Sequence, residues 1–304
     1  MPDAASPAEA LAVATGPARP VTVRGSQLPQ RDVTVGGLRV RIADTGPSTK
    51  SDATRTLVIL PGHTSRLEGY DSLVRHLLQR HRVLTLDFPG TGYSDKPVRS
   101  YSLRFYEDTL IDLLNALSID EAVLVGGSLG GNLVLRLGHR FPQRFPLLVS
   151  WAPASAWRAR PRLAAWIRRL GGRALFWPMV RIQSRFWYAR DFPGRRAALA
   201  ETFAYYREVM CPGFVRMYWE IAADQVATSL FGIAPQIAQP VLLLWGDQDD
   251  GAGMRAGVAK LRELLPHAEL RVFRGVRHSI ETEVPDDLAR AIDEFVTRPF
   301  GRLP

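Results

Sequence analysis

The pattern of hydrophobic and polar positions along this chain changes near residue 56. Before that point, residues 31–35 and 38–42 alternate between apolar and polar side chains on either side of Gly36-Gly37. This alternation predicts a hairpin with a two-residue turn. After residue 56, short continuous apolar runs recur, as expected of strands that are buried on both faces. These runs lie at Thr56 to Leu60, Arg82 to Leu86, Ala122 to Gly126, Pro146 to Ser150, Val241 to Trp245 and Glu269 to Phe273.

Helical patterns separate these apolar runs. In the clearest of them, one face at the i, i+4, i+7, i+8 and i+11 positions carries Tyr106, Leu110, Leu113, Leu114 and Leu117. Strands that alternate with helices predict an α/β fold with a mostly parallel sheet flanked by helices. The alternation is interrupted once, between Ser150 and Val241, by a long segment that is helical or irregular and rich in arginine and aromatic residues. We interpret this segment as an inserted helical cap.

The same patterns predict the domain organisation. Residues 31–152 and 237–304 are expected to form the α/β core, with the cap at residues 153–236. Residues 1–30 are rich in alanine and proline, lack periodicity, and are expected to be a disordered extension. Asp3 and Glu9 lie near the N-terminus, where a secretory signal carries positive charge, and no stretch approaches the roughly 18 apolar residues of a membrane span. We therefore expect a cytoplasmic protein without a transmembrane segment.

The net charge of +9 is concentrated in one part of the chain. Residues 154–196 contain eleven arginines and a single acid, Asp191, whereas the remaining residues sum to about zero. Such a local excess does not favour a nucleic-acid-binding protein. It is compatible with a solvated helix face. It is equally compatible with an anionic partner, which would be an acidic substrate, an acyl carrier or coenzyme A thioester, or an anionic lipid surface.

A lone serine, Ser128, stands in a glycine frame between a predicted strand and a predicted helix. A sharp turn from strand to helix strains the middle residue and brings neighbouring backbone close, so small residues are required two positions before and after it. Gly126 and Gly130 occupy those positions. Because glycine-rich turns are common, this motif alone is weak evidence for catalysis, and its context has to decide.

Three more segments follow predicted strands with chemistry-bearing residues. Gly62-His63-Thr64 has backbone N–H groups available for a developing oxyanion, Asp249 follows a late strand, and His278 follows the last one. Open parallel sheets bind ligands outside the carboxyl ends of their strands, where all these segments are expected to meet. An imidazole can take the proton of a serine hydroxyl if a carboxylate orients it. The chain order serine, aspartate, histidine fits this interpretation.

With these motifs the chain resembles the α/β-hydrolase family, in particular its capped branch of esterases, carbon-carbon bond hydrolases, dehalogenases and epoxide hydrolases. Asp87 to Ser94 is similar to the family's D-x-P-G-x-G-x-S loop, and Glu281 to Pro285 is similar to its closing segment. The resemblance extends from about Arg31 to Arg298. It departs from the family at the oxyanion turn, where Pro61-Gly62 replaces the usual His-Gly.

The resemblance implies a role for each matching residue. Ser128 would be the nucleophile, His278 the base and Asp249 the orienting acid. The backbone N–H groups of His63 and Leu129 would form the oxyanion hole, while the role of the His63 side chain stays open. Aromatic and polar positions expected to contact substrate are Thr64, Trp151, Trp157 and Trp166. No phosphate-binding loop is present, and we expect neither a cofactor nor a metal.

A serine nucleophile indicates acyl chemistry, because displacement at a saturated carbon in this family uses a carboxylate. We therefore predict a serine hydrolase that cleaves an ester, thioester or lactone through an acyl-enzyme on Ser128. A carbon-carbon bond hydrolase of a vinylogous diketone is the second interpretation, since such enzymes tend to carry a tryptophan soon after the histidine and a Ser-Gly-rich oxyanion turn, both absent here. An acyltransferase, a perhydrolase or a ligand receptor would use the same frame.

Overall fold

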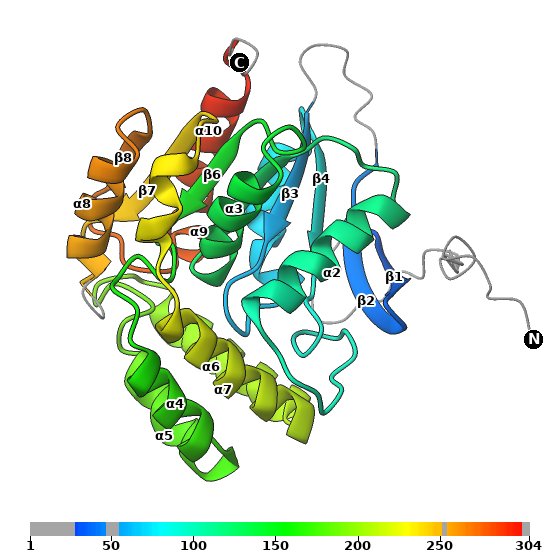
Figure 1. The fold of residues 1–304 in the computed structure, drawn as a ribbon, viewed down its shortest axis with the longest axis vertical. Helices are drawn as coiled ribbons and strands as arrows, with labels where there is room; N and C mark the ends of the chain where they lie inside the picture. The colour runs from blue at the N-terminus through cyan, green and yellow to red at the C-terminus, as the bar shows by residue number, and fades with distance from the viewer. Residues whose placement is uncertain (1–27, 47–54, 251–253, 300–304) are drawn as a thin grey trace, which may run out of the picture.

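The computed structural model describes residues 28–46, 55–250 and 254–299. Figure 1 shows one twisted β-sheet with helices on both faces, which confirms the predicted α/β fold. The sheet has eight strands in the order β1-β2-β4-β3-β5-β6-β7-β8. They are β1 (Gln30–Val35), β2 (Leu38–Asp44), β3 (Thr56–Leu60), β4 (Arg82–Leu86), β5 (Val123–Gly127), β6 (Leu148–Trp151), β7 (Val241–Gly246) and β8 (Glu269–Phe273).

The predicted N-terminal hairpin is confirmed. Strands β1 and β2 pair antiparallel, and Gly36 and Gly37 between them have φ angles of 54° and 76°. Two consecutive positive φ values are the geometry of a tight hairpin turn, which glycine adopts without strain. The extension was predicted over residues 1–30, but β1 begins at Gln30, so the predicted boundary is one residue too late; residues 1–27 lie outside the described residues.

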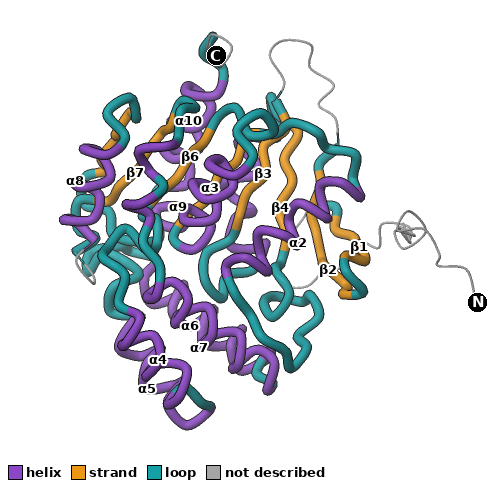
Figure 2. Tube along the Cα trace, viewed as in Figure 1, coloured by secondary structure: helices purple, strands orange, loops and turns teal. Residues whose placement is uncertain are grey.

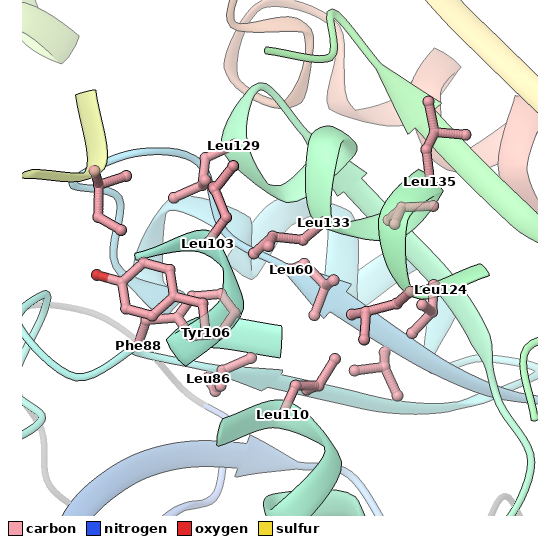
Figure 3. Packing of buried hydrophobic residues seen from close by; sticks show 14 of the residues in the cluster. Leu60, Leu86, Phe88, Leu103, Tyr106, Leu110, Leu124, Leu129, Leu133 and Leu135 are labelled. Carbon is pink, nitrogen blue, oxygen red and sulfur yellow. The ribbon is translucent and has the colours of Figure 1, made fainter. Parts of the chain in front are cut away.

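From β3 to β8 the strands are parallel, and alternate side chains enter the cores on the two faces. Leu57 and Ile59 face one core with α1 (Asp71–Leu77), α9 (Ile280–Glu283) and α10 (Pro285–Val296). On the opposite face, Val58 and Leu60 pack against α2 (Leu103–Ala116) and α3 (Leu129–Arg140). Figure 3 shows Leu60 between side chains of these two helices. Burial on both faces explains the continuous apolar runs.

Four helices and two short 3-10 turns connect β6 to β7, in the segment predicted as the cap. The helices are α4 (Pro161–Leu170), α5 (Arg173–Gln183), α6 (Arg195–Val209) and α7 (Pro212–Ala227), followed by turns at Leu230–Gly232 and Ala234–Gln236. Figures 1 and 2 show α4 and α5 at the end of the molecule, with α6 and α7 nearer to the sheet. Both α4 and α5 contact α7.

Strand β8 differs from the prediction of a strand buried on both faces. It pairs only with β7 at the edge of the sheet, flanked by α8 (Met254–Leu264), and Val272 is 51% exposed. The apolar composition of this run indicated a strand but contained no information on its place in the sheet. Among the described residues, no helix is both long and apolar enough to cross a membrane.

Candidate active site

Ser128 occupies the sharp turn between β5 and α3. Its φ and ψ angles are 55° and −115°, a conformation that residues with a Cβ atom rarely adopt and that costs on the order of 1–3 kcal/mol. Three backbone hydrogen bonds hold the turn: the Ser128 N–H donates to the Trp151 carbonyl at 3.0 Å, and the N–H groups of Ala154 and Asn132 donate to the Ser128 carbonyl at 2.9 and 3.0 Å. The surrounding structure thus maintains a strained serine at the carboxyl end of the sheet.

The glycines around Ser128 are required by close contacts. A Cβ atom on Gly126 would lie 2.6 Å from the carbonyl carbon of Gly130, and one on Gly130 would lie 1.9 Å from the carbonyl oxygen of Leu60. A Cβ atom on Gly127 would lie 1.9 Å from Nε1 of Trp151. The first two contacts explain the glycine frame seen in the sequence. The third shows that the indole of Trp151 lies directly beneath the turn.

His278 and Asp249 are brought together from loops after β8 and β7. Nδ1 of His278 lies 2.8 Å from Oδ2 of Asp249, whose side chain is buried. The neighbouring acids are engaged elsewhere, because Asp247 accepts a hydrogen bond from the Gly275 N–H and Asp250 pairs with Arg277. Of these three aspartates, it is Asp249 that contacts the imidazole.

One cavity of about 650 Å³ joins these residues. Ser128, Asp249 and His278 line it, as do His63 and three of the four predicted substrate-contacting residues, Thr64, Trp151 and Trp157. The fourth, Trp166, is not among the lining residues and is 59% exposed on α4. The structure therefore does not bring Trp166 to the candidate site.

Two backbone amides near Ser128 are candidates for binding an oxyanion, that of Leu129, the next residue in the chain, and that of His63, which lines the cavity. Leu129 is the first residue of α3, so its N–H has no acceptor within the helix. The N–H of His63 lies in the turn after β3, and the preceding turn is fixed because the Gly62 N–H donates to the Tyr70 hydroxyl at 2.8 Å. Within the described residues, neither the Leu129 nor the His63 amide donates a backbone hydrogen bond. Both are therefore available to a ligand oxygen.

The side chain of His63 has a different environment from its amide. The ring stacks on Tyr218 of α7, with 5.0 Å between ring centroids, and its Nε2 is buried without a hydrogen-bond partner among the described residues. Burial lowers the pKa of His63 to about 4, although a backbone hydrogen bond with Tyr218 opposes the shift. The imidazole is therefore neutral at physiological pH.

This lowered pKa predicts an acid-dependent loss of stability that belongs to His63. The unfolded chain binds a proton at this side chain below about pH 6.5, but the folded chain does so only below about pH 4. Acidification from pH 7 to pH 4 should therefore cost up to about 3 kcal/mol at this site. His63→Gln has no titrating group at this position. The difference in the free energy of urea unfolding between wild type and His63→Gln should therefore become less favourable to wild type by up to about 3 kcal/mol between pH 7 and pH 4. A difference independent of pH would contradict the assignment.

Glu281 was not among the predicted site residues; in the sequence it was noted only as the start of the segment Glu281 to Pro285. It lines the cavity from α9, three residues after His278, and its Oε2 accepts a hydrogen bond from Nε1 of Trp151 at 3.0 Å. Burial raises the pKa of Glu281 above its ordinary value, while the charge of His278 and the Trp151 hydrogen bond oppose that shift. The spacing of three from His278 was the only sequence signal for this position.

Nearby carboxylates change the pKa of the His278 imidazole. Burial alone would lower its pKa, but the charge of Asp249 and the hydrogen bond to it, followed by the charges of Glu281 and Glu283, raise the pKa of His278 above its ordinary value. A raised pKa makes the neutral imidazole a stronger proton acceptor. The arrangement fits a base oriented by Asp249.

The charged side chains that line the cavity are mainly acidic. They are Glu68, Glu201, Asp249 and Glu281, together with a single arginine, Arg66. Arg66 is itself neutralised, because it pairs with Glu201 at 2.7 Å and with Glu68 at 3.7 Å. None of the eleven arginines in residues 154–196 lines the cavity. The basic character of the cap therefore lies outside the candidate site.

The family assignment rests on a comparison with known protein families. The model described as alpha/beta hydrolase fold matches residues 55–281, which is most of the chain. The chain belongs to the alpha/beta hydrolase fold family. The matched range includes the Ser128 turn, Asp249 and His278, as well as the whole helical insertion.

This chain is similar to proteins that have been given different activities and to one that is uncharacterized. An uncharacterized protein of Mycobacterium tuberculosis is 33% identical over 118 residues, which cover 38% of this chain and only 32% of that protein. A 2-hydroxymuconate semialdehyde hydrolase of Pseudomonas putida is 27% identical, with 72% of this chain and 78% of the relative covered. Among solved structures, an enol-lactonase from Burkholderia xenovorans has a TM-score of 0.76 at 21% identity, covering 88% and 100% of the two chains. This last similarity shows a shared fold.

Proposed function

We propose that this alpha/beta hydrolase cleaves an ester-type bond, in an ester, thioester or lactone, through an acyl-enzyme on Ser128. The observation that supports this most strongly is the 2.8 Å contact between His278 and the buried Asp249, in the same cavity as the strained Ser128. Strain of this kind persists at functional sites because the surroundings maintain it.

The proposed reaction follows from these positions. Nδ1–H of His278 donates to Asp249, which leaves Nε2 free to take the proton from the Ser128 hydroxyl. The serine oxygen attacks the substrate carbonyl, and the backbone N–H groups of Leu129 and His63 stabilise the oxyanion. His278 then gives its proton to the leaving oxygen or sulfur. Water, activated by the same imidazole, hydrolyses the acyl-enzyme and restores Ser128.

The cavity lining supports an uncharged acyl group. Aromatic side chains of the cap contribute much of its wall, among them Phe186, Trp187, Tyr205, Tyr206 and Tyr218. The described lining residues offer a carboxylate substrate no unpaired arginine or lysine, because their one arginine, Arg66, is already paired with Glu68 and Glu201. We therefore propose that an acidic substrate is not the reason for the arginine-rich cap.

A panel of purified substrates tests this function. We expect turnover of short uncharged p-nitrophenyl esters. Comparing their rates with those of thioesters and lactones shows which leaving group the protein prefers. A carbon-carbon bond hydrolase is the second candidate, favoured by the similarity to the 2-hydroxymuconate semialdehyde hydrolase over 78% of that relative. Turnover of a vinylogous diketone without any ester cleavage would support the second candidate and contradict the first. Binding without turnover of any substrate would favour a receptor.

The proposal predicts that Glu281 sets the pH range of activity through His278. The base must be neutral to act, so kcat/KM should fall as the pH drops through the pKa of His278, which lies above its ordinary value. In Glu281→Gln one of the charges that raise this pKa is gone, so the acidic limb of the profile should move to lower pH. A lower rate with an unmoved limb would show a merely structural role. Asp287→Asn, an exposed acid on α10, is the matched control and should not move the limb.

A further inference from the structure

The cap carries exposed apolar side chains in a regular pattern on α4. Leu163, Trp166 and Leu170 occupy positions i, i+3 and i+7, which form one face of a helix, and they are 44%, 59% and 56% exposed. The side of α4 toward α7 is a different one, on which Ala164 is buried. These three apolar side chains of α4 are therefore exposed to solvent and are not buried against α7.

Helix α5 continues the pattern. Leu175, Pro178 and Ile182 recur at i, i+3 and i+7 on α5, Phe186 follows in the turn after the helix, and all four are exposed. We call these four residues, with Leu163, Trp166 and Leu170, the cap stripe. At its α5 end the stripe reaches the candidate active site, since Ile182 and Phe186 line the cavity. Two apolar side chains of the stripe are thus both exposed on the outer surface and part of the cavity lining.

Arginines accompany the cap stripe on both helices. Exposed members are Arg162 and Arg169 on α4, Arg173 and Arg181 on α5, and Arg185 directly after it. None of these five forms a salt bridge with another described residue, whereas Arg168 is neutralised by Asp224. Because none of them lines the cavity either, their charge has no partner within the described part of the protein.

An ordinary solvated helix face does not explain this combination. Monomeric proteins rarely expose several large apolar side chains in one line, and such surfaces mark interaction sites. Arginine charge next to exposed tryptophan and leucine is typical of a helix that lies in the headgroup region of a membrane. There, the guanidinium groups meet lipid phosphates and the apolar side chains reach the acyl chains.

We propose that the cap stripe and its arginines dock this enzyme on the surface of an anionic lipid bilayer. When the cap stripe lies on the bilayer, Ile182 and Phe186 contact the lipid, and these two residues also line the cavity. An apolar acyl substrate can then enter the cavity without crossing water. The acidity of a carrier protein would complement the arginines, but acidity alone provides no contact for the exposed Trp166 and Leu170. The bilayer satisfies both the charge and the apolar surface.

Vesicle flotation with the full-length protein tests the proposal. We expect binding to vesicles that contain phosphatidylglycerol and phosphatidylcholine, weaker binding as salt is raised, and little binding to phosphatidylcholine alone. Ser128→Ala should bind as wild type does, because docking does not use the nucleophile. Loss of ester hydrolysis and loss of lipid binding are thus separate results, and failure of one proposal is distinguishable from failure of the other.

Variants far from the cavity identify the surface. Trp166→Gln combined with Leu170→Gln should weaken partitioning by about tenfold or more, since each change removes a large apolar contact. Arg162→Gln combined with Arg169→Gln should weaken it by a similar factor and reduce its salt dependence. Val272→Gln, 51% exposed on β8, and Arg75→Gln, exposed on α1, are matched controls and should bind as wild type does.

Four results would overturn the proposal. The first is no association of the folded protein with anionic vesicles, and the second is association that the control variants reduce as much as the cap variants do. The third is a stable dimer in sedimentation that Trp166→Gln dissociates, which would make the cap stripe an interface between two copies. Capture of an acidic carrier protein without lipid binding would likewise contradict docking on a bilayer.

Discussion

Replacing Ser128 with alanine is expected to lower kcat for ester hydrolysis by on the order of 10⁴ to 10⁶-fold. The hydroxyl is the only group of this residue that the proposed reaction uses, and no other described residue accepts or donates a side-chain hydrogen bond with it. Alanine also lacks bulk beyond Cβ, so the turn should keep its shape. Turnover is measured with a p-nitrophenyl ester, and circular dichroism verifies the fold.

The same reaction predicts that Ser128 and His278 act as a unit. His278→Ala should lose a comparable factor, and the double variant should be no slower than either single variant. Additive losses would show that the two side chains contribute separately. Activity of Ser128→Ala within tenfold of wild type would remove the serine mechanism altogether.

Asp249→Asn is expected to lower kcat by on the order of 10⁴-fold while KM changes little. An amide at this position presents a donor to the imidazole and stabilises the wrong tautomer, because Nδ1 of His278 lies only 2.8 Å from the Asp249 oxygen. The measurement is steady-state kinetics on the same ester, with the acidic limb of the pH profile as a second readout. The limb should move to lower pH, since the charge of Asp249 raises the pKa of His278.

Two neighbouring acids are natural controls for this variant. Asp247→Asn should retain activity within a fewfold, because the Asp247 side chain accepts a hydrogen bond from the Gly275 N–H and does not contact the imidazole. Asp250→Asn should behave similarly, since Asp250 pairs with Arg277 at an exposed position. Equal losses in Asp247→Asn and Asp249→Asn would indicate a general effect on the loop.

The strands of the core were predictable because burial on both faces leaves a signal in local sequence. β3 and β4 have the predicted bounds, and β5 and β6 are shifted by one or two residues. The hairpin turn was equally local, since Gly36-Gly37 requires positive φ angles. The exposure of β8 was not predictable, because the apolar composition of a strand does not indicate whether a neighbour covers its edge.

The proximity of Asp249 and His278 followed from the rule that parallel strands end at one edge of a sheet. Contacts that depend on packing between distant elements did not follow. Glu281 meets Trp151 through the docking of α9 beneath the turn of Ser128. Trp166 was predicted to contact substrate as an aromatic residue of the cap, but sequence alone does not determine which way its helix faces, and in the structure Trp166 is 59% exposed.

The basic cap shows the same limit of sequence reasoning. A run of arginines indicates an anionic partner or a solvated face, but only the structure separates the cavity lining from the outer surface. The cavity is acidic and aromatic, whereas the arginines accompany an exposed apolar stripe. We therefore propose a different ligand for each feature, an uncharged acyl substrate for the cavity and an anionic lipid surface for the exposed stripe.

Covalent labelling with a fluorophosphonate, followed by intact-mass and peptide analysis, tests the central claim most directly. The probe reacts with a serine whose proton is removed by a neighbouring base, and its phosphonate oxygen takes the place of the oxyanion. We predict one adduct per chain, on the peptide that contains Ser128, absent in Ser128→Ala and much slower in His278→Ala. A folded wild-type protein that stays unlabelled, or that is labelled at another residue, would contradict the assignment of Ser128 as the nucleophile.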